Sequence, residues 1–164
     1  MFDRSGDMEQ LYEAYVQDVY RFLFSRCGDA DLAEELTQET FFRAISSIGR
    51  FRGECSVKSW LFQIAKHCLY RQWNRNKREK SVELTADLFD AAFTPEDDYV
   101  ARESVKCLYQ NILKLPENMR ETVLLRLSGD LSFREIGEVL GKSENWARVT
   151  FFRAKQRLME ADKE

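Results

Sequence analysis

The fold is decided by residues 131–158, which read LSFREIGEVLGKSENWARVTFFRAKQRL. Ser132 and Glu135 have the spacing of a capping box, in which each side chain accepts a hydrogen bond from the other residue's backbone N–H at the start of a helix. Gly141 can end that short helix, because glycine adopts the left-handed conformation of a C-terminal cap at little cost. Ser143 can then cap a second, longer helix. Two capped helices joined by so tight a turn predict a helix-turn-helix.

The second helix of this pair has one side for burial and one side suited to DNA. Ala147, Phe151, Ala154 and Leu158 recur at helical spacing and form the apolar stripe. A recognition helix offers its other side to the major groove, where arginine bonds guanine, asparagine bonds adenine and apolar side chains cover thymine methyls. If that side only faced water, its apolar side chains would cost free energy, since nothing would cover them. The candidate DNA-reading residues are Asn145, Arg148, Val149, Phe152 and Arg153.

Outward from this motif, the rest of the chain has the periodicity of helices. The chain holds only 7 Gly and 2 Pro among 164 residues, too few for a turn-rich β-sandwich. Asp29 or Asp31 can cap the second helix, Ser56 the third, and Pro116 fits the first position of the fifth. The predicted class is all-α, with helices over 8–27, 32–48, 57–74, 98–115 and 117–128 upstream of the motif.

Residues 81–98 have the composition of a linker. They are acidic, they contain Thr94-Pro95-Glu96, and their apolar residues are scattered without helical spacing. We therefore expect two small helical domains, 1–80 and 99–164, joined by a flexible acidic linker. The chain is long enough for two small domains.

The third helix combines aromatic rings and cations, a pattern that suits single-stranded DNA, because unpaired bases stack on rings and cations follow phosphates. Trp60, at the edge of the apolar stripe, is assigned to the core, whereas Tyr70 is expected to point away from it. The stripe expected to be buried is Val57, Trp60, Leu61, Ile64, Ala65, Cys68, Leu69 and Gln72. The side expected to face solvent is Ser59, Gln63, Lys66, His67, Tyr70 and Asn74, followed by the basic residues Arg75, Lys77, Arg78 and Lys80.

The net charge of −3 conceals a segregation of charge along the chain. Residues 66–80 hold six bases against one acid, and residues 142–157 hold five bases against one acid. Because phosphate binding depends on local charge, these two blocks are compatible with a DNA-binding protein. Residues 29–39 hold five acids and no base, so this block must face water or a basic protein surface. From the residues alone, water is the simpler interpretation.

Several other classes of protein are disfavoured. Cys27, Cys55, Cys68 and Cys107 share no metal-binding spacing, and His67 is the single histidine, so we expect buried free thiols and no metal site. The sequence has no phosphate-binding loop and no Ser-His-Asp set, which predicts no catalytic residue, no cofactor and no small-molecule substrate. The first residues have no signal-peptide pattern, and no apolar run is long enough to span a membrane. A cytoplasmic protein without direct membrane insertion is expected.

With these segments placed, the sequence resembles the extracytoplasmic-function sigma factors of bacterial RNA polymerase over nearly its full length. The similarity lies in several motifs that occur in the family's order, which makes it far more specific than any one motif. They are DADLAEELTQETF at 29–41, FRGE at 51–54 with SWLFQIA at 59–65, LPENMR at 115–120, and LSFREIG at 131–137 with RAKQRL at 153–158.

The resemblance implies a promoter-specificity factor and assigns roles to matching residues. The first domain would bind the clamp helices of the polymerase's largest subunit and the minus-ten element, and the second would read the minus-thirty-five element. The implied polymerase-binding residues are Asp31, Glu35, Gln38, Glu39 and Phe42. The implied minus-ten residues are Phe51, Ile64, Lys66, His67, Tyr70 and Arg71. The implied minus-thirty-five residues are Arg148, Val149, Phe152 and Arg153, all already found from periodicity.

The resemblance also implies partners and two departures from the family pattern. Core RNA polymerase, including the flap of its second-largest subunit, promoter DNA and an anti-sigma factor are the implied partners. His67 stands where the family often has asparagine, so the preferred minus-ten base is expected to differ. Asn145-Trp146 replaces the small residues usual after the turn, so the start of the recognition helix is expected to differ as well.

The main alternative is a helix-turn-helix regulator that binds duplex DNA as a dimer and needs no polymerase. This alternative explains residues 99–164 but gives no role to the acidic block or to the aromatic and basic side of the third helix. Binding to core polymerase distinguishes the two interpretations.

Overall fold

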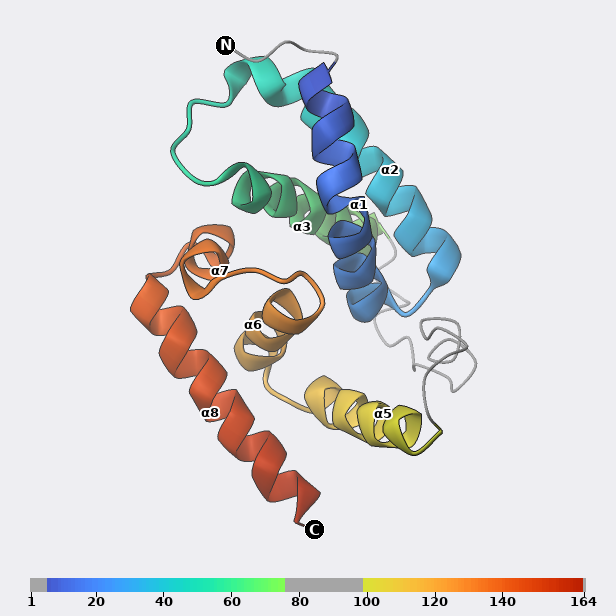
Figure 1. The fold of residues 1–164 in the computed structure, drawn as a ribbon, viewed down its shortest axis with the longest axis vertical. Coiled ribbons are helices and arrows are strands. Elements are labelled where there is room, and N and C mark those ends of the chain that lie inside the picture. Colours follow the sequence, from blue (N-terminus) through green and yellow to red (C-terminus); the bar gives the residue numbers. More distant parts are fainter. Residues whose placement is uncertain (1–5, 76–98, 164) are drawn as a thin grey trace.

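Helices make up all the regular structure in the described part of the chain, which confirms the all-α class (Figure 1). The computed structural model describes residues 6–75 and 99–163. The proposed linker 81–98 and the basic residues Lys77, Arg78 and Lys80 lie outside these ranges. The first range contains α1 (Gly6–Cys27), α2 (Ala30–Ser47), the short 3-10 helix η1 (Ile48–Arg50) and α3 (Val57–Arg75). The second contains α5 (Tyr99–Leu113), α6 (Glu117–Leu127), α7 (Phe133–Leu140) and α8 (Glu144–Asp162).

The caps of the first helices follow the sequence signals, with one correction. The Asp29 carboxylate accepts hydrogen bonds from the backbone N–H groups of Asp31 and Leu32, so Asp29 is the residue that caps α2. The Ser56 hydroxyl accepts the Ser59 N–H at 3.0 Å at the start of α3. The placement of Pro116 inside the fifth predicted helix was wrong. Its ψ of 150° is extended, so it is the N-cap that precedes α6.

The helix-turn-helix formed by α7 and α8 is confirmed in its local details. Ser132 and Glu135 form both bonds of the capping box, and the Ser143 hydroxyl accepts the Trp146 N–H at 3.0 Å. Gly141 has φ +69°, the left-handed conformation that favours glycine, and it ends α7. Because α8 begins at Glu144 behind a regular cap, Trp146 does not disturb the entry of this helix.

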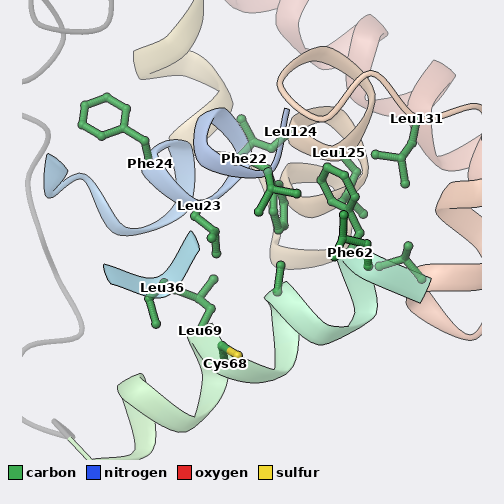
Figure 2. Packing of buried hydrophobic residues seen from close by; sticks show 14 of the residues in the cluster. Phe22, Leu23, Phe24, Leu36, Phe62, Cys68, Leu69, Leu124, Leu125 and Leu131 are labelled. Carbon is green, nitrogen blue, oxygen red and sulfur yellow. The ribbon is translucent and has the colours of Figure 1, made fainter. Parts of the chain in front are cut away.

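The helices of residues 6–75 form a first unit, and those of residues 99–163 form a second. The core of the first unit lies where α1, α2 and α3 meet (Figure 2). Leu23, Leu36 and Leu69 are almost fully buried there, one from each helix. Phe22 and Phe62 pack with their ring centroids 5.6 Å apart. Complete burial of such side chains contributes roughly 1.5–3 kcal/mol each, so the contact of the three helices is a main source of stability.

The core continues without interruption into the second unit, which the sequence did not predict. Phe62 of α3 is fully buried and points toward Leu125 and Leu131 of the second unit, as Figure 2 shows. The helices α6 and α7 lie against α1 and α3 (Figure 1). A Cβ on Gly129 would lie only 2.9 Å from the Phe62 ring, so the two units are in close contact.

This contact corrects the predicted faces of α3. Ser59 was expected to face solvent, but it is fully buried, and Phe62, absent from the predicted stripe, is buried too. Trp60 and Ile64, both predicted to be core residues, are half-buried and pack against the core. The physical reason is that a second helical unit covers the side of α3 that periodicity had assigned to water.

Candidate DNA and protein interfaces

The outer side of α8 remains open to solvent. Ala147 and Ala154 are fully buried against the rest of the second unit, while Val149 and Phe152 are 37 % and 52 % exposed. Exposed apolar side chains beside arginines are what a helix needs to read base edges and thymine methyls. All five residues predicted to read DNA lie on the exposed surface: Asn145, Arg148, Val149, Phe152 and Arg153.

Arg148 is held in place by two neighbours that the sequence analysis missed. Its guanidinium lies 3.3 Å from the Glu144 carboxylate and 5.8 Å from the centre of the Phe133 ring. A second cation, Arg126, lies 4.5 Å from the same ring. An exposed ion pair of this kind contributes little stability, but together with the ring it restricts the directions in which Arg148 can point.

The side chains predicted to bind a single strand do gather around α3, but they are less exposed than expected. Phe51 packs on Trp60 with ring centroids 5.1 Å apart, and Tyr70 stacks on Trp73 at 5.5 Å. The Lys66 ammonium lies 5.3 Å from the centre of the Tyr70 ring. Among the predicted residues, His67 is exposed, whereas Phe51, Ile64, Lys66, Tyr70 and Arg71 are half-buried.

Tyr70 was expected to point away from the core, and this was wrong. Its hydroxyl donates a hydrogen bond of 2.8 Å to the Glu121 carboxylate of α6, and Lys66 lies 3.8 Å from the same carboxylate oxygen. Burial, followed by the neighbouring charge of Glu121 and its hydrogen bond, raises the pKa of Tyr70 far above its ordinary value. The phenol is therefore a neutral donor throughout the physiological pH range.

Further polar contacts join the two units in the first half of α3 and just before it. The Gln63 amide donates to the Glu138 carbonyl at 3.1 Å, and the Lys58 ammonium donates to the Asp130 carbonyl at 2.8 Å. The Ser56 hydroxyl donates to Glu135, the carboxylate of the capping box, at 2.8 Å.

Glu135 shows the effect of these contacts on a carboxyl group. Burial opposes its ionisation, but the Ser132 N–H and the Ser56 hydroxyl donate to the carboxylate and more than compensate. The net result is a lowered pKa for Glu135. The pKa of Glu135, whose carboxylate caps α7, therefore depends in part on the contact with the first unit.

The acidic side of α2 forms one exposed stripe. Asp31, Glu35, Gln38 and Phe42 are exposed, as a contact surface requires, and Phe42 is 71 % exposed. Glu39 is half-buried and pairs with Arg43 at 3.0 Å. Ile45 is 55 % exposed next to Phe42 along the same stripe. Large apolar side chains in water beside acids indicate a surface that another protein covers.

A groove that no sequence pattern indicated lies between α5, α6 and α8. It has a volume of about 810 Å³ and its walls are mainly apolar. Cys107 lies in this groove and is exposed, and Cys55 is half-buried, so the expectation of buried thiols holds only for Cys27 and Cys68. The apolar lining includes Leu108, Leu127, Phe151, Leu158 and Met159.

Two kinds of feature, a metal-binding group of side chains and a membrane-spanning helix, were sought in the part of the chain that the structure covers. Within residues 6–75 and 99–163, no three His, Cys, Asp or Glu side chains are arranged to hold a metal ion. Among the helices described there, none combines the length and hydropathy of a membrane span.

Comparison with known proteins gives matches across both units. The family described as Sigma-70 region 2 matches residues 11–79, and Sigma-70, region 4 matches residues 106–158. The RNA polymerase sigma factor YlaC of Bacillus subtilis is 30 % identical over 154 residues, covering 92 % of this chain and 89 % of that protein. The ECF RNA polymerase sigma factor SigM of the same organism is 35 % identical over 153 residues, covering 92 % of each chain.

Two solved structures have the same fold. The sigma factor RpoE, in its complex with the anti-sigma factor NepR from Bartonella quintana, superposes with a TM-score of 0.71 at 22 % identity. That superposition covers 96 % of this chain and 97 % of RpoE. CnrH, in complex with the cytosolic domain of CnrY, gives a TM-score of 0.68 at 20 % identity and covers 95 % of this chain and 87 % of CnrH.

Proposed function

Because this chain belongs to the RNA polymerase sigma factors of the extracytoplasmic-function type, we propose how its residues divide the work of promoter recognition. As a sigma factor, the chain binds core RNA polymerase, recognises the minus-ten and minus-thirty-five elements and initiates transcription. The match of residues 11–79 to region 2 removes the alternative of a dimeric helix-turn-helix regulator, which gave no role to the acidic block or to the aromatic and basic side of α3.

The minus-thirty-five element is read by α8. The single observation that carries this assignment is an exposed face on which Val149 and Phe152 stand beside arginines, on a helix that is capped at Ser143. Arg153 reaches a base edge, and Arg148, restrained by Glu144 and Phe133, reaches a second base or a phosphate. Asn145 lies in the first turn, where a recognition helix enters the groove.

The minus-ten strand is held by α3 and the segment before it. Stacked rings at Tyr70 and Trp73, with the Lys66 ammonium beside them, supply the platform and the charge that an unpaired strand needs. His67, exposed on the same helix, is available to an unpaired base. The remaining residues of this site are Phe51, Ile64 and Arg71.

Core polymerase is bound by the exposed stripe of α2. Asp31, Glu35 and Gln38 supply charge and polarity toward the clamp helices of the largest subunit, and Phe42 supplies the apolar contact. Glu39 belongs to the same contact through its pair with Arg43. We propose domain limits of 1–80 and 99–164 with 81–98 as the linker.

The apolar groove between α5, α6 and α8 takes the flap of the second-largest polymerase subunit. Its mainly apolar walls suit the apolar side of a helix. An anti-sigma factor is a second proposed partner, supported by the shared fold of two sigma factors whose structures are complexes with such proteins or with the cytosolic domain of CnrY.

The chemistry of RNA synthesis stays with the polymerase. We propose that this chain has no catalytic residue, cofactor, metal or small-molecule substrate of its own. Its place of action is the cytoplasm, where core polymerase and promoter DNA are found, without direct insertion into a membrane.

A pull-down tests the proposed division of surfaces. The full chain is immobilised and incubated with purified core polymerase, and Phe42→Ser is compared with Tyr12→Ser, which alters another exposed aromatic residue. The proposal predicts that the chain retains polymerase and that Phe42→Ser retains much less of it than Tyr12→Ser. Equal retention by both variants would remove the α2 stripe from the contact.

A further inference from the structure

Lys142 lies in the turn between α7 and α8, and its backbone is held from both sides. Its N–H donates a hydrogen bond of 2.8 Å to the Gly137 carbonyl of α7. Its own carbonyl oxygen packs so closely on Gly137 that a Cβ there would lie only 2.7 Å from it. Gly141, directly before it, has the left-handed conformation that ends α7. The turn therefore defines the point from which the Lys142 side chain extends.

The side chain of Lys142 is held in turn by the ring of Trp146. The ammonium lies 5.5 Å from the ring centre, within the roughly 6 Å over which an indole attracts a cation. The ring is half-buried and packs against the core, and the Trp146 N–H donates to the Ser143 hydroxyl at 3.0 Å. Trp146 is thus a fixed support that limits where the ammonium can lie.

This ammonium has no acid to neutralise it nearby. Lys142 is exposed, and within residues 6–75 and 99–163 it pairs with no carboxylate. The two acids nearest to it in the sequence are engaged elsewhere, Glu138 with Arg134 at 3.5 Å and Glu144 with Arg148 at 3.3 Å. A positioned cation of this kind is suited to an anion from outside the chain.

The pair formed by Lys142 and Trp146 lies beside the reading face of α8. Trp146, Val149 and Arg153 are spaced i, i+3 and i+7, so they follow one another along one side of the helix. At about 100° per residue, Trp146 and Arg148 lie on opposite sides of Val149. A helix in the major groove has a sugar-phosphate backbone on each side of it. The anion that a cation meets at this position is therefore a backbone phosphate.

We propose that Lys142 binds a backbone phosphate at the edge of the minus-thirty-five element and that Trp146 is the residue that positions it. This inference rests on the proposed role of α8. A phosphate carries no base identity, so the contact strengthens binding to all sequences alike and determines how α8 lies in the groove. Because a bound phosphate releases counterions, the contact also makes DNA binding more sensitive to salt.

Reconstituted holoenzyme and a fluorescein-labelled duplex test the proposal by fluorescence anisotropy, in salt from about 50 to 200 mM. The duplex carries the upstream element of a promoter that run-off transcription with this chain has mapped, and a second duplex has that element altered. Lys142→Gln removes the charge, and Lys163→Gln makes the same change at an exposed position after α8. Trp146→Leu removes the ring, and Trp146→Phe keeps an aromatic ring there.

Lys142→Gln should reduce the slope of log affinity against log salt by about 0.9, the value for one lost phosphate contact, and Lys163→Gln should leave the slope unchanged. Both duplexes should lose affinity by the same factor, so discrimination between them persists. Trp146→Leu should lower the slope by a smaller amount, and Trp146→Phe should restore it. In the Trp146→Leu background, Lys142→Gln should have less effect than in the unaltered chain.

An unchanged slope for Lys142→Gln would overturn the phosphate contact, and a loss confined to one duplex would replace it with base reading. Independent effects of Lys142→Gln and Trp146→Leu would overturn the positioning role. Lys142→Gln alters only an exposed side chain, so the first test does not depend on how well Trp146→Leu folds.

The outcome is separable from the fate of the proposed function. If Arg153→Ala loses discrimination between the two duplexes while Lys142→Gln keeps its slope, the phosphate contact alone is wrong. If neither Arg153→Ala nor Lys142→Gln changes DNA binding, the assignment of α8 is wrong first.

Discussion

Arg148 and Arg153 share the outer side of α8, but their surroundings differ. Arg148 is oriented by Glu144 and by the ring of Phe133, which restricts the directions it can take. Arg153 is exposed on the same helix without being part of that cluster. A bidentate contact of arginine with guanine discriminates between bases by about 1–3 kcal/mol, so single arginines on this face can decide promoter choice.

Arg153→Ala should reduce discrimination at the minus-thirty-five element by roughly 1–3 kcal/mol, because a base contact is lost. Competition between a promoter and the same promoter with an altered minus-thirty-five element measures this in a run-off assay with holoenzyme. Arg21→Ala, at an exposed position of α1, provides the control with the same loss of charge. Unchanged promoter preference would remove Arg153 from the reading residues.

Tyr70→Ala should impair strand opening more than formation of the closed complex, because the stacking surface for an unpaired base is removed. Permanganate footprinting reports the unpaired thymines, and gel retention of duplex promoter reports the closed complex. Tyr70→Phe, which keeps the ring and loses only the hydroxyl, should lose less opening than Tyr70→Ala. A normal footprint with Tyr70→Ala contradicts the role.

At the scale of the helices, the N-terminal caps of α2 and α7 determine where each helix begins and thereby which side chains lie on its exposed surface. The Asp29 cap begins α2, and its acids and Phe42 then fall on one exposed stripe. The capping box of α7 determines where the helix-turn-helix begins, and its Glu135 also receives a hydrogen bond from Ser56 of the other unit. A helix start can therefore serve both folding and the contact between units.

Glu35→Lys should weaken binding to core polymerase by about tenfold, equivalent to about 1.4 kcal/mol, by reversing a charge within the proposed contact. Fluorescence anisotropy of a labelled chain titrated with core polymerase measures the affinity. Binding of random duplex DNA by the free chain should be unaffected, since α8 is unchanged. Glu13→Lys on α1 is the matched control, and equal affinities for the two variants would count against the stripe.

Ser132→Ala should lower the free energy of unfolding by about 0.5–2 kcal/mol, the usual loss for a removed N-cap. Urea denaturation followed by circular dichroism measures it. Ser46→Ala, which changes an exposed serine within α2, should have a much smaller effect. If the two variants are equally stable, the capping box does not hold α7.

Through Glu135, the stability of the folded chain should depend on pH. Its pKa is lower in the folded chain than the ordinary value of 4.5, so its contribution to stability is present above that value and is lost as the pH falls through the folded pKa. Glu135→Gln should therefore be less stable than the unaltered chain at neutral pH. The difference should shrink in acid, and a difference that stays constant with pH would contradict this origin.

At the scale of the whole molecule, the features that depend on neighbouring residues could be predicted from the sequence, and those that depend on distant residues could not. The helices and the turn at Gly141 follow from caps and periodicity, which act within a few residues, so sequence alone predicted them. The exposed residues of α8 were predicted for the same reason. The burial of Ser59 and Phe62 was not, because it depends on α7 and on the segment around Gly129, which pack on α3 from far along the chain.

The contact of Tyr70 with Glu121, on the side of α3 assigned to the minus-ten strand, could not be predicted for the same reason. Tyr70 and Glu121 are 51 positions apart, and nothing in the local pattern of α6 indicates that Glu121 is buried. The groove between α5, α6 and α8 likewise exists only once three elements meet. A sequence pattern describes the sides of single helices, whereas these features belong to the arrangement of the two units.

Selective initiation is the most direct test of the central claim that two helical units recognise separate stretches of one promoter while bound to the polymerase. Core polymerase, with and without this chain, is given a set of genomic DNA fragments, and the run-off transcripts are sequenced. The account predicts a small set of defined start sites, each with shared upstream elements, that appear only with the chain present. Transcripts no more selective than those of core polymerase alone would contradict it.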